Sequence, residues 1–110
     1  MIFKPELVEL IVAGRKTQTR RPDRGVPCRY LPGREYAVQP GRGMRQVARI
    51  AVEAVWSTTP AHITTHEAHA EGFDSIGEFL AYWDRLYPGS DFGERVWAIQ
   101  FRLVSTRGDV

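Results

Sequence analysis

The stretch "EYAVQPGRGMRQVARIAVEAVWS" (residues 35–57) decides the fold class, because it has the pattern of two strands joined by a turn. Residues 35–39 form a short apolar strand. Residues 40–45 contain a proline and two glycines, which are typical of turns. In residues 46–57 apolar and polar side chains alternate, so one face carries Ala48, Ile50, Val52, Ala54 and Trp56. We therefore predict a β-hairpin.

The chain after the hairpin changes to helical patterning. Thr64 with Glu67, and Ser75 with Glu78, match the sequence signature of a helix start. We predict a short helix that ends at Gly72 and a second helix over residues 75–87. A strand follows at 95–104. The large aromatic side chains of the second helix and this strand are expected in the core, and they are Phe79, Trp83, Trp97 and Phe101.

The chain before the hairpin begins with an amphipathic helix over residues 4–14, with Pro5 in its first turn and Gly14 as its C-terminal cap. Residues 22–33 hold three prolines and two glycines, which predict a loop. Strands therefore stand on both sides of a helical insert. This order predicts an α+β fold, a small mixed β-barrel with flanking helices, as a single domain over residues 1–110.

The composition of the 110 residues restricts where the protein works. No apolar run approaches the roughly 20 residues that span a bilayer, and the acidic residues near the N-terminus do not fit a signal peptide. The single cysteine, Cys28, has no disulfide partner within the chain and suits a reducing compartment. We therefore expect a cytoplasmic protein without membrane contact.

Charge is distributed unevenly along the chain. Residues 1–49 carry eleven Lys and Arg against four Asp and Glu, whereas residues 50–110 carry four against nine. One interpretation is a phosphate-bearing partner for the basic half. The other is a solvated surface whose two halves complement each other in the fold.

The segment "AGRKTQTRRPDR" (residues 13–24) concentrates this positive charge. Neighbouring arginines disfavour an ammonium group and so lower the pKa of Lys16, which would make it a general base. The Thr19 hydroxyl, three residues on, would then be the nucleophile. The alternative is a solvated basic segment that follows a helix.

Two further groups of side chains bear on the chemistry. Glu71 stands at the negative end of a predicted helix, where a nearby lysine or arginine would compensate it. His62, His66 and His69 do not match the spacing of a zinc motif, so we predict no metal site and no cofactor.

The motifs "GRKTQTRR" (14–21), "EYAV" (35–38), "EGFDSIGEFLAYWDRLYPG" (71–89) and "RVWAIQF" (95–101) together resemble the ASCH domain family. The compact form resembles versions common in bacteriophage genomes. The resemblance implies a PUA-like β-barrel related to RNA-binding modules. Some members of the family hydrolyse the acetyl amide of N4-acetylcytidine with a lysine, a threonine and a glutamate. Others are ribonucleases or RNA-binding modules.

Carried onto this sequence, the resemblance implies Lys16, Thr19 and Glu71 as catalytic residues. Gln18 and Arg20 replace apolar residues of the amidohydrolase pattern, and the loop that follows is longer and rich in Pro and Arg. The added positive charge favours a polynucleotide. We expect RNA or a modified nucleoside as the partner. The candidate binding residues are Arg15, Thr17, Arg20, Arg21, Arg42 and Arg45. The alternatives are a ribonuclease and a binding module without turnover, in which Tyr30 or Tyr36 stacks on a base.

Overall fold

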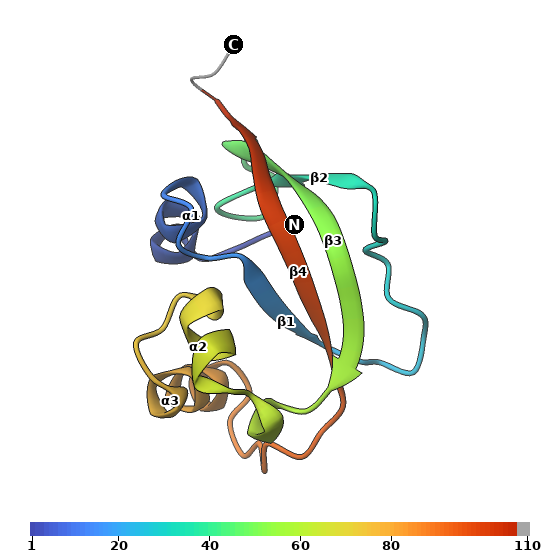
Figure 1. The fold of residues 1–110 in the computed structure, drawn as a ribbon, viewed down its shortest axis with the longest axis vertical. Coiled ribbons are helices and arrows are strands. Elements are labelled where there is room, and N and C mark those ends of the chain that lie inside the picture. Colours follow the sequence, from blue (N-terminus) through green and yellow to red (C-terminus); the bar gives the residue numbers. More distant parts are fainter. Residues whose placement is uncertain (108–110) are drawn as a thin grey trace.

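The computed structural model describes residues 1–107 and has one curled sheet with its helices gathered on one side (Figure 1). The elements in order are α1 (Pro5–Val12), β1 (Gln18–Pro22), β2 (Glu35–Val38), β3 (Ala48–Thr58), the 3₁₀ turn η1 (Pro60–His62), α2 (Thr65–Glu71), α3 (Ile76–Leu86) and β4 (Val96–Thr106). The strand order is β1-β4-β3-β2, and all three pairings are antiparallel. The predicted α+β class is confirmed, with the sheet forming an open half-barrel.

The predicted hairpin is present as β2 and β3. The predicted alternation of buried and exposed side chains along β3 is wrong beyond Val52. A β-bulge lies between Val52 and Ala54, where the register against β4 shifts by one residue. Val52 is buried and Glu53 is exposed, while Trp56 is only half-buried. An extra residue in one strand exchanges the faces on which the following side chains lie. Strict alternation therefore predicts Trp56 to be more buried than it is.

The predicted starts of α2 and α3 are confirmed by their caps, whereas the first helix, predicted over residues 4–14, is observed as Pro5–Val12. Thr64 and Glu67 form a capping box at the start of α2, and the Ser75 hydroxyl accepts the backbone N–H of Glu78 at the start of α3. Each cap satisfies backbone groups that a helix end leaves without partners. No helix within residues 1–107 is long and apolar enough to cross a membrane.

Two apolar clusters form the core. One lies between α1 and the upper sheet and includes Phe3, Ile50 and Phe101; the other lies between α2, α3 and the start of β4 and includes Phe79 and Trp83. Phe73 packs against both. Three of the four predicted core aromatics are therefore buried. Trp97 is only half-buried, because its ring borders a surface cavity.

Candidate functional site

The backbone between α1 and β1 ties three parts of the fold together. The carbonyl of Leu10 in α1 accepts the N–H groups of Arg15 and Lys16, at 2.9 and 3.1 Å. Thr17 donates its N–H to Ala70 O in α2 at 2.7 Å and accepts the N–H of Phe101 in β4 at 2.9 Å. These bonds fix Lys16 at the point where α1, α2 and the sheet meet.

Close packing at Gly72 allows the Lys16 side chain to enter the interior. Gly72 caps α2 with φ +104°, a conformation that glycine adopts readily. A Cβ at this position would lie 2.8 Å from Leu10 Cδ1 and 3.8 Å from Lys16 Cβ. The glycine therefore permits α1, α2 and Lys16 to approach one another.

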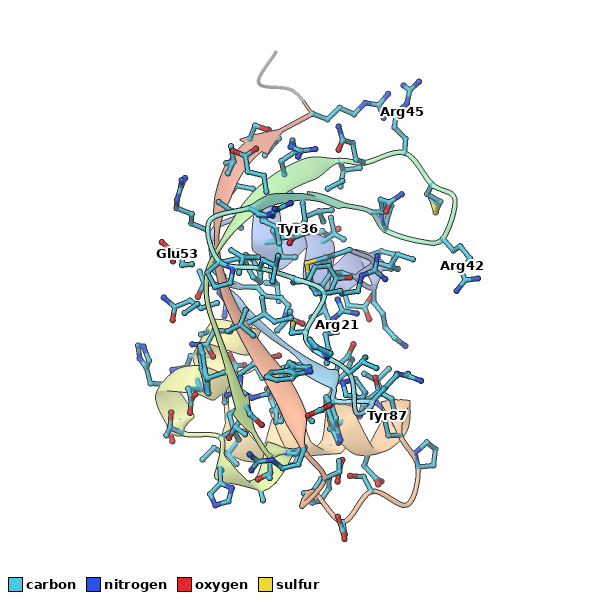
Figure 2. The ribbon with its side chains drawn as sticks, turned by 90° about the vertical axis from the view of Figure 1, so that its right-hand side faces the viewer. Arg21, Tyr36, Arg42, Arg45, Glu53 and Tyr87 are labelled. Carbon is cyan, nitrogen blue, oxygen red and sulfur yellow. The ribbon has the colours of Figure 1, made fainter. Side chains whose placement is uncertain are left out.

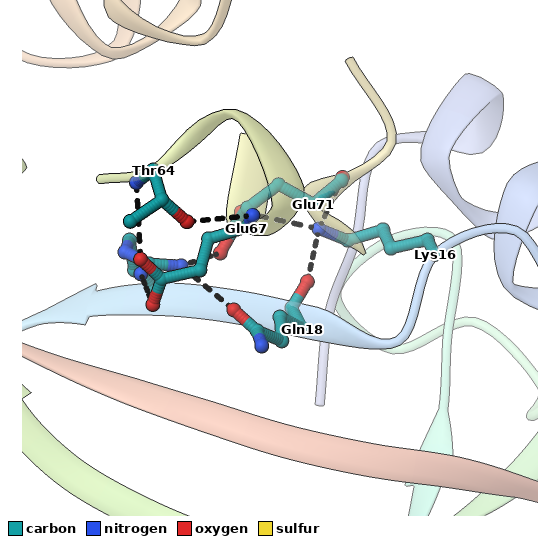
Figure 3. A network of polar contacts seen from close by, with 6 residues as sticks. Lys16, Gln18, Thr64, Glu67 and Glu71 are labelled. Carbon is teal, nitrogen blue, oxygen red and sulfur yellow. Dashed lines mark hydrogen bonds and ion pairs between the residues drawn. The ribbon is translucent and has the colours of Figure 1, made fainter. Parts of the chain in front are cut away.

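The Lys16 ammonium is buried and fully hydrogen-bonded (Figure 3). Nζ donates to Gln18 O at 2.7 Å, to Glu71 O at 2.8 Å and to Glu71 Oε1 at 3.3 Å. A lysine has three N–H donors, so the charged form is satisfied. The positive charge also meets the free carbonyl end of α2, which stabilises that helix end.

Glu71 joins Lys16 to a second buried cation. Its Oε2 accepts Arg20 Nη1 at 2.9 Å, and Arg20 Nη2 reaches Glu67 Oε2 at the same distance. Arg20 Nη1 also donates to Gln18 Oε1 at 3.1 Å. Two cations therefore face two carboxylates, which offsets the cost of taking these charges out of water. The sequence-based expectation that a cation compensates Glu71 is confirmed for both Lys16 and Arg20.

The pKa of Lys16 is lowered from its ordinary value, as predicted, but mainly for a different reason. Burial is the largest cause, because desolvation disfavours the ammonium form. Glu71 opposes the shift, and the charges of Arg21 and Arg20 lower the pKa of Lys16 further by smaller amounts. The crowding of arginines is thus the minor contribution.

Lys16 and Glu71 form part of the wall of a cavity of about 280 Å³. Thr19, Arg20 and Arg21 from β1 also line it. The rest of the lining is mostly aromatic and apolar, with Phe3, Phe79, Tyr82, Trp83, Leu86 and Tyr87. The cavity therefore combines a polar wall that contains a buried lysine with aromatic faces, an arrangement that suits a small planar ligand with polar edges.

The structure separates the predicted site residues into two groups. Lys16, Thr19, Glu71, Arg20 and Arg21 come together at the cavity. The Arg20 guanidinium faces carboxylates within the protein, whereas Arg21 Nη2 donates to the Ile2 carbonyl at 2.9 Å and the guanidinium carbon stands 4.9 Å from the centre of the Phe3 ring.

The other predicted binding residues do not line this cavity. Arg15 is exposed, 3.8 Å from Asp74, and Thr17 lies just before β1. Arg42 and Arg45 project from the β2–β3 loop, above Arg21 in Figure 2. Within the basic segment 13–24, Arg20 and Arg21 thus line the cavity whereas Arg15 does not, which the charge pattern alone does not reveal.

Sequence reasoning misses the aromatic wall of the cavity. The sequence pattern does not distinguish Phe3 or Tyr82 from core residues, and it places Tyr87 at a helix end. Their only signal is their apolar character, which core residues share. The histidines lie apart from the cavity: His62 contacts Thr59, and His69 contacts the carbonyl of Asp74. Within residues 1–107 no group of three potential metal ligands is found.

The comparisons with known proteins agree with this architecture. No family model and no curated protein matches the chain. Among solved structures, a protein of Enterococcus faecalis V583 from family DUF984 has a TM-score of 0.75 at 19% identity, over 92% of this chain and 68% of that one. An ASCH domain from Lactobacillus crispatus JV V101 has a TM-score of 0.71 at 15% identity, over 91% and 71%. The ASCH protein of Zymomonas mobilis has a TM-score of 0.63 at 19% identity, over 93% and 64%. The chain therefore has the ASCH fold, which confirms the fold expected from its motifs.

Proposed function

We propose that the cavity binds a nucleobase, in RNA or in a free modified nucleoside, and that Lys16, Thr19 and Glu71 hydrolyse an acylated exocyclic amide of the N4-acetylcytidine type. One observation carries the proposal: segments 55 residues apart in sequence place a buried lysine–glutamate pair on the wall of an aromatic cavity that Thr19 also lines.

The size and the walls of the cavity support a base-sized ligand. Its volume of about 280 Å³ is near the lower limit of typical small-molecule sites. Aromatic side chains bind nucleobases by stacking, which contributes about 1–3 kcal/mol per base. The polar groups of the lining would then meet the hydrogen-bonding edge of the base.

The chemistry needs the neutral form of Lys16, which the resting ammonium reaches by losing a proton; burial lowers the pKa of Lys16 and so reduces the cost of that loss. Its amine accepts the proton of the Thr19 hydroxyl as the Thr19 oxygen attacks the acyl carbon. The tetrahedral intermediate collapses by breaking the bond to the amide nitrogen, and the departing amine takes the proton back from Lys16. Water then hydrolyses the ester on Thr19, releasing acetate. Glu71 positions Lys16 throughout, through its contact at 3.3 Å.

The test uses N4-acetylcytidine, both free and within a short single-stranded RNA. We expect equimolar cytidine and acetate from the parent protein, separated by chromatography. Thr19→Val keeps the side-chain shape and removes the hydroxyl, so it should abolish product while the protein stays folded. A parent protein that forms no product with either substrate, or a Thr19→Val variant as fast as the parent, contradicts hydrolysis by this site.

A second candidate function is RNA binding without turnover. It is favoured by the saturated hydrogen bonding of Lys16, whose three donors all have acceptors within the protein. In this case the lysine holds α2 against β1, and Arg21 contacts phosphate. A ribonuclease would use the same cations to stabilise developing negative charge at a phosphodiester. Labelled RNA incubated in the same assay separates these functions. RNA that stays intact and bound indicates a binding module, and cleaved RNA indicates a ribonuclease.

A further inference from the structure

A second cavity, of about 330 Å³, adjoins the first one. Both cavities are lined by Arg21 and Tyr87, which therefore stand between them. Figure 2 shows these two residues near each other on one side of the molecule, away from Glu53. The remaining walls come mostly from the loop after β1: Pro22, Arg24, Val26, Pro27, Cys28, Arg29 and Tyr30, with Trp97 of β4.

The charge of the second cavity is entirely positive. Three arginines line it, Arg21, Arg24 and Arg29, and no acidic residue of the described part of the chain does. None of the three has a carboxylate within ion-pair distance among the described residues 1–107. The buried Nε of Arg21 also has no hydrogen-bond partner among residues 1–107. Positive charge without internal compensation favours an anionic ligand, and arginine is well suited to phosphate.

The second cavity also offers aromatic faces. Trp97 pairs with Arg21 across β1 and β4, so both side chains lie on the same face of the sheet. Tyr30 packs edge-to-face against Tyr36, with ring centres 5.0 Å apart, and the Arg29 guanidinium carbon lies 5.3 Å from the Tyr30 ring centre. The Tyr36 hydroxyl accepts the N–H of Leu31 at 2.8 Å, which holds the loop in place.

From these walls we propose that the second cavity receives the nucleotide next to the base bound in the first cavity, so that the ligand is single-stranded RNA and the linking phosphodiester lies at Arg21. This inference rests on the proposed function, because it needs a base in the first cavity. Arg24 and Arg29 contact the other phosphate of the second nucleotide, on the side away from the linking phosphodiester. Trp97 or Tyr30 stacks on its base.

The test measures binding, so that it does not depend on turnover. A labelled seven-nucleotide single-stranded RNA is titrated with the parent protein and with Arg24→Ala, Arg29→Ala and the double variant. Arg102→Ala is the matched control, since Arg102 is exposed on β4 and lines neither cavity. The affinity for free cytidine, the nucleoside product of the proposed reaction, is measured in parallel.

We expect the double variant to bind RNA about tenfold more weakly or worse, which corresponds to the loss of charged hydrogen bonds. Its log–log salt dependence should flatten by about 0.7 for each phosphate that the variant no longer neutralises. Affinity for the free nucleoside should stay at the parent value, as should the RNA affinity of Arg102→Ala.

Three results would overturn the inference. The first is a double variant that binds RNA as well as the Arg102→Ala control. The second is an equal loss of RNA and nucleoside affinity, because that places the arginines at the first cavity. The third is that an acidic peptide with the same net charge as the RNA competes with it for binding, which would indicate a protein partner. Failure of the parent protein to bind the nucleoside contradicts the proposed function separately.

Discussion

Replacing Glu71 by glutamine would remove the carboxylate that two buried cations share. The Glu71 side chain is only 4% exposed, and its oxygens lie 3.3 Å from Lys16 Nζ and 2.9 Å from Arg20 Nη1. An amide keeps one acceptor but turns an N–H₂ group toward one of the cations. Three charges then remain in the network, and only the carboxylate of Glu67 is negative.

The expected loss follows from the cost of leaving a buried charge unpaired, about 3–5 kcal/mol. A domain of this size is typically stable by about 5–15 kcal/mol in total. With a urea m-value of about 2 kcal/mol/M, the denaturation midpoint should fall by roughly 1.5–2.5 M. Urea titration followed by tryptophan fluorescence measures this shift.

Two companion variants show whether the loss comes from the ion pairs. Glu9→Gln is the matched control, because Glu9 is exposed on α1, and its effect should stay within about 0.5 kcal/mol. Lys16→Met combined with Glu71→Gln leaves the Arg20–Glu67 pair and should destabilise less than the two single losses added together. If Glu71→Gln is no more harmful than Glu9→Gln, the account of the buried network is wrong.

Three other predictions concern pH and packing. If the neutral Lys16 amine is the base, kcat/KM for N4-acetylcytidine should rise with pH and level off at a pH below the ordinary pKa of a lysine, since burial lowers the pKa of Lys16; a kcat/KM that falls as the pH rises would contradict this role. The pKa of Glu67 is lowered from its ordinary value: burial raises it, but hydrogen bonds from Thr64 and the charge of Arg20 outweigh burial. That carboxylate therefore stabilises the fold above about pH 4.5 and progressively less as the pH falls below it, so parent and Glu67→Gln stabilities should converge in acid, as followed by urea titration at several pH values. Gly72→Ala should cost more than Gly43→Ala in thermal denaturation, because both have positive φ but only the Gly72 methyl would meet Leu10, at 2.8 Å; equal losses would remove the packing argument.

The elements of the fold were predictable from the sequence wherever a local motif was enough to define them. The capping box of Thr64 and Glu67 fixed the start of α2, and the glycines after β2 marked the hairpin. The bulge at Glu53 was not predictable, because it reflects how β3 fits β4 rather than any property of its own sequence. The half-exposure of Trp97 likewise depends on a loop that is distant from it in sequence.

The candidate site was predictable only in part. The juxtaposition of Lys16 and Glu71 was expected from the family resemblance, and the structure places them in contact. The roles of the neighbouring arginines were not separable in sequence. Arg20 turns toward Glu67 and Glu71, whereas Arg21 borders both cavities. Adjacent residues of a strand point to opposite faces, but the sequence does not say which face of β1 meets α2.

The most direct test of the central claim is the Lys16→Arg variant, assayed for N4-acetylcytidine hydrolysis and for RNA binding in the same preparation. A guanidinium keeps the positive charge but does not lose its proton to act as a base. If Lys16 is the catalytic base, the variant should stay folded and retain RNA affinity near the parent value while hydrolysis falls to background. A folded variant that hydrolyses the nucleoside as fast as the parent would contradict the claim.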